Sequence, residues 1–219
     1  MKPLLHALAF LTIAPLRFSE RLEPEDFGRL PGYYPLVGLF LGLAAAVLAW
    51  VAYLAAAPAG FAATALAACQ IIFTRGFHLD GLADAADALL SHRSLEKKFE
   101  ILKDSRQGAF GVTAIVLDLL LKTSLLAALA PDGRFLTAPL ILYPVWGRLT
   151  ASIVAVRSDS ARPESGGLGC WMIQLSGPRE LFLALASTLT LSACGGWAAL
   201  AAALAAACLG LLLTPVWRR

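Results

Sequence analysis

The chain has 219 residues, of which 58% are hydrophobic and only 15% are charged, and its mean hydropathy is +0.71. These values exclude an ordinary soluble globular domain and indicate an integral membrane protein. The net charge is only +3, and no basic face with interleaved aromatic residues is present, so the composition favours contact with lipid headgroups over nucleic acid.

Along the chain, a short apolar segment comes first, and six longer ones follow it. We predict that residues 1–15 form a helix on the inner face of the membrane. The longer segments approach the ~20 residues that a helix needs to cross a hydrocarbon core of ~30 Å. We therefore predict an all-α fold, a polytopic membrane helical bundle with about six transmembrane helices and both termini cytoplasmic. The predicted spans are 33–57, 59–74, 111–130, 137–156, 181–194 and 196–214.

The distribution of Lys and Arg supports this topology, because cytoplasmic loops carry the excess of positive charge. With the N-terminus inside, fifteen of the 18 basic residues fall in cytoplasmic segments, and only Arg134 falls outside. The other two, Lys122 and Arg148, lie within predicted spans. No repeat or linker divides the chain, so we predict a single integral-membrane domain (1–219) whose chemistry lies in the cytoplasmic loops at about 75–110 and 157–179.

The first span carries small residues at four-residue intervals, namely Gly38, Gly42 and Ala46. Such a stripe allows another helix to approach closely. We interpret it as a packing surface.

Three carboxylates follow the second span. Asp80, Asp84 and Asp87 stand at i, i+4 and i+7, which places them on one face of a helix. Like charges at this spacing repel one another, and oxygen ligands suit a hard divalent ion such as Mg²⁺, which is usually held by one or two carboxylates plus substrate phosphates. We predict that these aspartates bind Mg²⁺. His78 precedes them and could be a ligand, a general base or a structural residue.

A second polar stretch, E-I-L-K-D-S-R-Q-G-A-F-G, occupies residues 100–111. Here Asp104 could add a ligand or act as a base, and Lys103 and Arg106 could hold phosphate oxygens. Gly108 and Gly111 permit a tight turn before the third span. The preceding charges, at 96–100, are interpreted as ordinary surface residues.

The two cations within spans are further candidates, since intramembrane ionisable residues usually face the protein interior and serve function. Lys122 has Asp118 four residues before it, so a structural pair is one interpretation. Arg148 has no partner within a helical turn and is the preferred phosphate contact.

These segments resemble those of the cobalamin synthase family, the adenosylcobinamide-GDP ribazoletransferases. The similarity rests on G-F-H-L-D-G-L-A-D-A-A-D at 76–87 and K-D-S-R-Q-G-A-F-G at 103–111. It is supported by F-L-T-I-A-P at 10–15, Y-P-L-V-G-L-F-L-G at 34–42, L-L-L-K at 119–122 and G-R at 147–148.

The resemblance implies a Mg²⁺-dependent enzyme of a bacterial or archaeal cytoplasmic membrane. Its substrates would be adenosylcobinamide-GDP and α-ribazole or α-ribazole 5′-phosphate. A ribose hydroxyl attacks the cobinamide-side phosphorus, GMP leaves, and adenosylcobalamin or its phosphate forms, which is a late step of cobalamin biosynthesis. In that reading Asp80, Asp84 and Asp87 bind the metal, Asp104 and His78 are catalytic, and the substrate contacts are Arg106, Arg148, Lys103 and Lys122.

Two alternative activities remain, besides a receptor or a purely structural subunit. A lipid enzyme related to CDP-alcohol phosphotransferases is one, but Asp84 and Ala85 stand where its D-G-x-x-A-R element has Ala and Arg. A small cation carrier is the other, although carriers tend to bind ions between repeated halves near the midplane. The sequence leaves open the preferred lower base, the assignment of ligand and base among the aspartates, and association as a homo-oligomer or in a corrinoid-assembly complex. It also leaves open whether the activity needs the G-G-x-T-G-D-x-x-G-A segment that family members usually carry after the last span.

Overall fold

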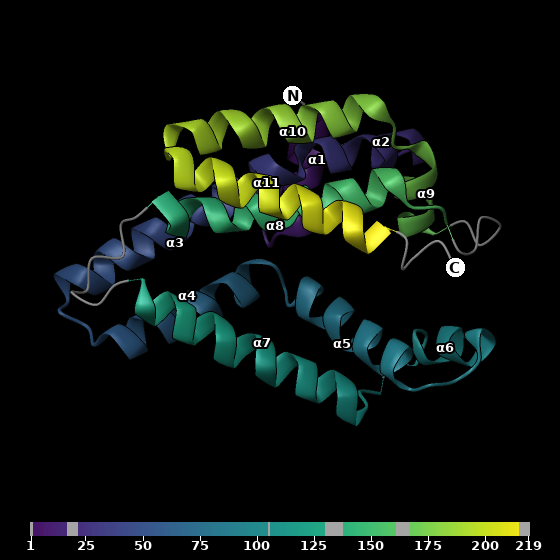
Figure 1. Cartoon of the computed structure of the whole chain (residues 1–219), viewed down its shortest axis with the longest axis horizontal. Coiled ribbons are helices and arrows are strands. Elements are labelled where there is room, and N and C mark those ends of the chain that lie inside the picture. Colours follow the sequence, from purple (N-terminus) through teal and green to yellow (C-terminus); the bar gives the residue numbers. More distant parts are fainter. Residues whose placement is uncertain (1, 17–21, 105, 130–137, 161–166, 215–219) are drawn as a thin grey trace. The chain divides into compact units, whose positions relative to one another are not determined.

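The computed structural model describes residues 2–16, 22–104, 106–129, 138–160 and 167–214, and all the regular secondary structure in these ranges is helical (Figure 1). The predicted all-α class is therefore confirmed for the described residues. The elements are α1 (Lys2–Leu11), α2 (Pro24–Arg29), the 3₁₀ helix η1 (Leu30–Tyr33), α3 (Tyr34–Leu54), α4 (Ala59–Phe73), α5 (Phe77–Leu90), α6 (Leu95–Ile101), α7 (Ala109–Ala128), α8 (Ala138–Arg157), α9 (Leu168–Leu175), α10 (Pro178–Cys194) and α11 (Trp197–Leu213).

Each of the six predicted spans contains a helix, but their lengths and composition differ. Within the described residues, three helical stretches are long and apolar enough to cross a membrane, namely Pro24–Leu54, Ala109–Ala128 and Ala138–Arg157. A fourth candidate is the bent pair α4 and α5. Helices α10 and α11 have 17 residues each, which gives a length of about 25 Å. The chain is a helical membrane protein, whereas six crossings and cytoplasmic termini stay predictions.

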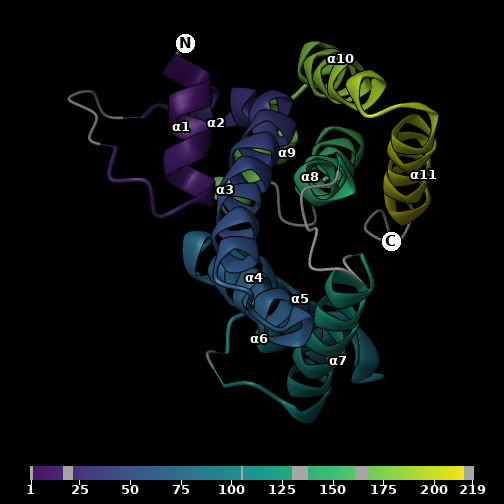
Figure 2. The same ribbon diagram turned by 90° about the vertical axis from the view of Figure 1, so that its left-hand side faces the viewer.

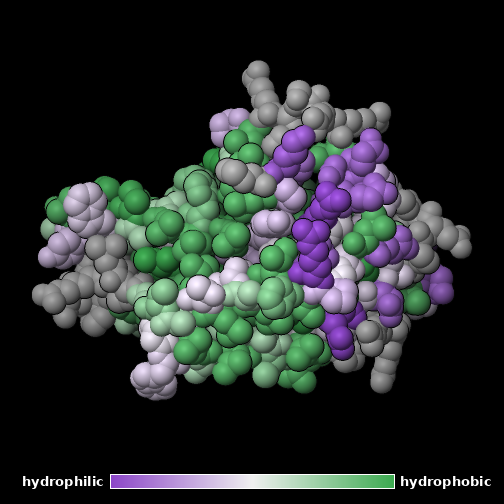
Figure 3. Space-filling view, turned by 90° about the horizontal axis from the view of Figure 1, so that it is seen from above, coloured by the Kyte–Doolittle hydropathy of each residue, from purple (hydrophilic) through white to green (hydrophobic). Residues whose placement is uncertain are grey.

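The exposed surface fits this interpretation. Figure 3 shows one face on which apolar side chains form broad areas and hydrophilic side chains gather in a separate area. Large apolar residues such as Trp197, Leu212 and Phe182 are 83%, 73% and 69% exposed. Apolar surface of this extent is rare on soluble monomers and is suited to contact with lipid.

The contacts divide the chain into two compact units, one of residues 1–47 with 136–219 and one of residues 48–135. A membrane domain can consist of two such units, so the single-domain interpretation stays a prediction. In the first unit α8 packs against both α10 and α11, as Figures 1 and 2 show. Leu149 and Ile153 of α8 form a buried cluster with Ala184 of α10.

The small-residue stripe of α3 meets α8. A Cβ atom added at Gly38 would overlap the backbone at Pro144, and one added at Gly42 would overlap the carbonyl oxygen of Ile141. Leu39 of α3 also packs on the buried cluster around Val145 of α8. The predicted packing role of this stripe is confirmed, because only glycine leaves room for such an approach.

In the second unit α7 packs against both α4 and α5, and the short α6 packs against α5 (Figures 1 and 2). This unit contains the candidate residues from His78 to Lys122.

Candidate functional site

The helix that carries the three aspartates begins after a sharp bend. The axes of α4 and α5 differ by 88°. Between them Arg75 and Gly76 have φ values of 54° and 68°, in the left-handed region that glycine adopts at little cost. The bend ends α4 and starts α5, which carries the three aspartates, in a new direction.

Helix α5 presents its carboxylates as the sequence predicted. Phe77–Leu90 is one continuous helix, so the i, i+4, i+7 spacing places Asp80, Asp84 and Asp87 on one face. Their environments differ, because Asp80 is exposed while Asp84 and Asp87 are half-buried. His78 is exposed, and its ring meets the Phe77 ring edge-on at a centroid distance of 5.5 Å.

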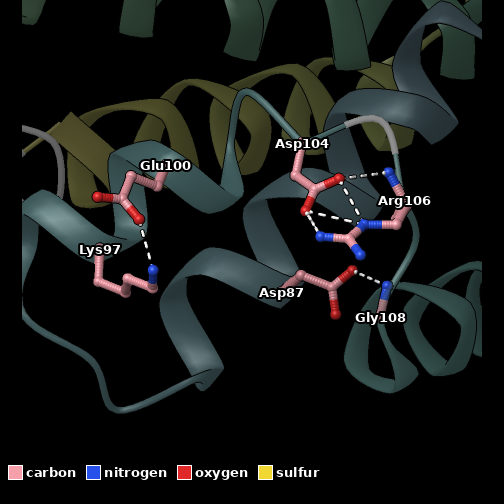
Figure 4. A network of polar contacts seen from close by, with 6 residues as sticks. All are labelled: Asp87, Lys97, Glu100, Asp104, Arg106 and Gly108. Atoms are coloured by element: carbon pink, nitrogen blue, oxygen red, sulfur yellow. Dashed lines mark hydrogen bonds and ion pairs between the residues drawn. The ribbon is translucent and has the colours of Figure 1, made fainter.

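Asp87 binds the first turn of α7. Its Oδ2 accepts a hydrogen bond from the backbone N–H of Gly108 at 2.8 Å, and its Oδ1 accepts one from Gly111 at 2.8 Å; Figure 4 shows the first of these. The first N–H groups of a helix have no partner within it, and the helix dipole favours a negative charge there. Asp87 therefore caps α7 from a helix more than twenty residues away.

The two glycines are explained by this cap. Neither has a positive φ, so a tight turn is not what requires them, contrary to the sequence interpretation. A Cβ atom at either Gly108 or Gly111 would instead overlap the Asp87 carboxylate. The glycines provide the space in which the carboxylate reaches the backbone.

In the loop before α7, Asp104 and Arg106 form a bidentate ion pair. Arg106 Nη2 lies 2.7 Å from Asp104 Oδ2, and Arg106 Nε and the Arg106 backbone N–H both donate to Asp104 Oδ1 at 3.0 Å (Figure 4). These hydrogen bonds lower the pKa of the Asp104 carboxyl to about 2 and raise the pKa of Arg106. Gln107 joins this loop to α5, because its Nε2 donates to Asp84 Oδ1 at 3.5 Å.

The two polar segments found in the sequence thus lie together. Asp84 and Asp87 of the aspartate helix contact Gln107, Gly108 and Gly111, at the end of the loop and the start of α7. Lys103 belongs to the same loop, and its side chain is exposed. Beside the loop lies an open hollow of about 530 Å³. It is lined by Asp87, Ser91, Arg93, Ile101, Asp104, Arg106, Gln107, Gly108, Ala109 and Phe110.

The intramembrane cations have different surroundings. Lys122 Nζ lies 2.8 Å from Asp118 Oδ2 within α7, which confirms the predicted pair. Arg148 is in α8 of the other unit, and its buried Nε has no hydrogen-bond partner among the described residues. The participation of Arg148 and Lys122 in substrate binding stays a prediction.

The donor set of α5 suits Mg²⁺ in its chemistry. Asp80 and Asp84 offer carboxylate oxygens that engage no described backbone N–H, and one or two carboxylates plus substrate phosphates are the usual ligands of this ion. Among the described residues, however, no group of three or more His, Cys, Asp or Glu side chains is arranged as a metal site. The substrate would have to complete the coordination, and the metal assignment stays a prediction.

Sequence reasoning missed the capping role of Asp87 and the contribution of Gln107. The cap joins residues that are far apart in the chain, so no local spacing could reveal it. Gln107 lies within the K-D-S-R-Q-G motif, and this position was the sequence signal that could have indicated its hydrogen bond to Asp84.

The Asp104–Arg106 pair predicts a measurable dependence on pH. Because the folded pKa of Asp104 is about 2 and its usual value is about 3.9, the pair stabilises the fold above pH ~4. That contribution is lost as the pH falls through about 2. We expect it to be small, since the Arg106 side chain is 87% exposed. Thermal unfolding of the native chain and Arg106→Ala across pH 2–6 checks this, and a stability difference that grew toward pH 2 would contradict it.

Comparisons with known proteins agree with the sequence resemblance. The family model described as cobalamin-5-phosphate synthase matches residues 3–219. Three proteins named adenosylcobinamide-GDP ribazoletransferase are similar. That of Syntrophobacter fumaroxidans is 41% identical over 83% of this chain and 73% of its own length. That of Desulfitobacterium hafniense is 46% identical over 77% of this chain and 66% of its own length. That of Pseudomonas putida is 38% identical over 91% of this chain and 80% of its own length. No solved structure matches.

Proposed function

Because the chain belongs to the cobalamin-5-phosphate synthase family, we propose that it is an adenosylcobinamide-GDP ribazoletransferase of the cytoplasmic membrane. It joins α-ribazole, or its 5′-phosphate, to adenosylcobinamide-GDP and releases GMP in cobalamin biosynthesis. The family match over residues 3–219 is the observation that carries this proposal. The contacts of the aspartate helix with Gln107, Gly108 and Gly111 support it, because both motif segments meet there.

In the proposed reaction a ribose hydroxyl oxygen forms a bond to the cobinamide-side phosphorus. The bond from that phosphorus to the bridging oxygen breaks, and GMP leaves with the electron pair. A basic group takes the proton of the hydroxyl. A bound Mg²⁺ would neutralise charge on the diphosphate and on the departing GMP.

We assign the metal ligands and the phosphate contacts to different residues of the chain. Asp80 and Asp84 are the proposed metal ligands. Asp87, the third ligand predicted from the sequence, is assigned to the cap of α7 instead, because both of its carboxylate oxygens accept backbone N–H hydrogen bonds there. Arg106 and Lys103 would bind phosphate oxygens from the loop, and Arg148 and Lys122 are proposed further contacts.

Two residues, Asp104 and His78, are candidates for the group that accepts the proton of the hydroxyl. Asp104, with a pKa of about 2 and a bidentate bond to Arg106, is a weak base in this arrangement. We therefore assign Asp104 first to holding Arg106 in position. His78, exposed in the first turn of α5, is the other candidate for the base.

GMP release by the purified chain in lipid nanodiscs tests the function. We expect release that requires adenosylcobinamide-GDP, α-ribazole or its phosphate, and Mg²⁺ together, with stoichiometric formation of the cobalamin product. Release of GMP without a ribazole would indicate a hydrolase instead. Release of CMP from a CDP-linked donor would favour the lipid phosphotransferase alternative.

A further inference from the structure

The hollow beside Asp87 has the size of a ligand site. Its volume of about 530 Å³ lies within the range of ~300–1,000 Å³ that is usual for small-molecule pockets. It belongs entirely to the unit of residues 48–135. Its wall combines the end of α5, the turn after it, α6, residues 104 and 106–108, and the start of α7.

The charged side chains of this wall are two carboxylates and two guanidinium groups. Asp104 neutralises Arg106 through an ion pair of 2.7 Å. Asp87 directs both carboxylate oxygens to backbone N–H groups of α7. Arg93, in contrast, is exposed and has no ion pair or side-chain hydrogen bond to any residue that the structure describes. An anion that enters the hollow could therefore bind Arg93 without competing with a carboxylate, whereas at Arg106 it would compete with Asp104.

Two helix ends fix the backbone around Arg93. Helix α5 ends at Leu90, and Ser91 Oγ donates to the carbonyl oxygen of Ala88 at 2.8 Å. His92 then has a φ of 50°, the left-handed conformation that often terminates a helix. Ser94 caps α6 immediately afterwards. Arg93 is thus held in a short turn between two caps, and its side chain begins at a defined place on the rim of the hollow.

We propose that Arg93 binds the diphosphate of the nucleotide-activated substrate, a deeper assignment that rests on the proposed function. The planar guanidinium group suits two phosphate oxygens at once. Arg93 would make the first contact, whereas Arg106 can bind phosphate only by sharing or leaving Asp104. Sequence reasoning counted Arg93 only among the positive charges of a predicted cytoplasmic loop.

The test compares Arg93→Gln and Arg93→Lys with Lys98→Gln, which removes a cation from α6 that does not line the hollow. Loss of one charge-assisted contact of about 1.4 kcal/mol corresponds to a tenfold change. We expect Arg93→Gln to raise KM for adenosylcobinamide-GDP about tenfold while KM for α-ribazole phosphate stays unchanged. Arg93→Lys should lie between, and Lys98→Gln should match the native chain.

Binding of GDP, measured by calorimetry without a ribazole, separates this proposal from the function on which it rests. If the native chain binds GDP more tightly than Arg93→Gln but releases no GMP, Arg93 binds diphosphate and the proposed function fails. If turnover occurs with the same KM in Arg93→Gln and Lys98→Gln, the proposed function stands and the role of Arg93 is overturned. Native protein that neither binds GDP nor turns over would overturn both.

Discussion

Gly111→Ala is expected to destabilise the chain by about 2–3 kcal/mol and to abolish most of its activity. The new Cβ atom would overlap the Asp87 carboxylate and lie 3.0 Å from the carbonyl oxygen of Ala83. Asp87 cannot move aside without losing its hydrogen bonds to Gly108 and Gly111. The methyl group would therefore separate α7 from α5 at the point where the two polar segments meet.

Gly81→Ala is the matched control, because Gly81 lies in α5 itself and a Cβ atom there meets nothing within 4 Å. Alanine is the better helix former by up to ~1 kcal/mol, so this variant should be as stable as the native chain or slightly more stable. Thermal unfolding in one detergent and GMP release in nanodiscs would be measured for both. Equal melting temperatures for Gly111→Ala and Gly81→Ala would show that the capping arrangement is not tight.

The architecture was predictable where it depends on local pattern. Apolar length predicts the helices, and the spacing of Asp80, Asp84 and Asp87 predicts their common face, since both follow from the geometry of a single helix. The glycine stripe of α3 was also sufficient to predict a close helix contact, because the requirement for small residues is local.

The site was predictable only in part, since its decisive contacts are not local. Sequence spacing treats the three aspartates as equivalent, but Asp87 is engaged by the backbone of α7 and Asp80 is exposed. The same limit applies to Gly108 and Gly111, whose space requirement comes from a side chain on another helix. The ion pair between Asp104 and Arg106 also changes the role assigned to Asp104. A carboxylate that is bound to a guanidinium group in this way is a poor base.

This division among the aspartates leads to a prediction that separates stability from chemistry. Asp87→Asn should lose about 1–3 kcal/mol of stability, because an amide has one acceptor oxygen where two backbone N–H groups need partners. Its NH₂ group would face one of these donors. Asp84→Asn should change stability by less than ~0.5 kcal/mol, because the amide oxygen can still accept from Gln107 Nε2.

Activity should respond differently from stability, because Asp84→Asn is expected to lower the rate of the reaction without lowering stability. If the charge of Asp84 holds Mg²⁺ against the diphosphate, Asp84→Asn should lower kcat about 100-fold or more, in a protein whose melting temperature is unchanged. The measurement is GMP release against Mg²⁺ concentration for both variants, with melting temperatures taken on the same samples. A stable Asp84→Asn protein with native rates and native Mg²⁺ dependence would remove Asp84 from the metal site. Because Asp87 is committed to the backbone of α7, that result would leave Asp80 as the carboxylate of α5 to test next.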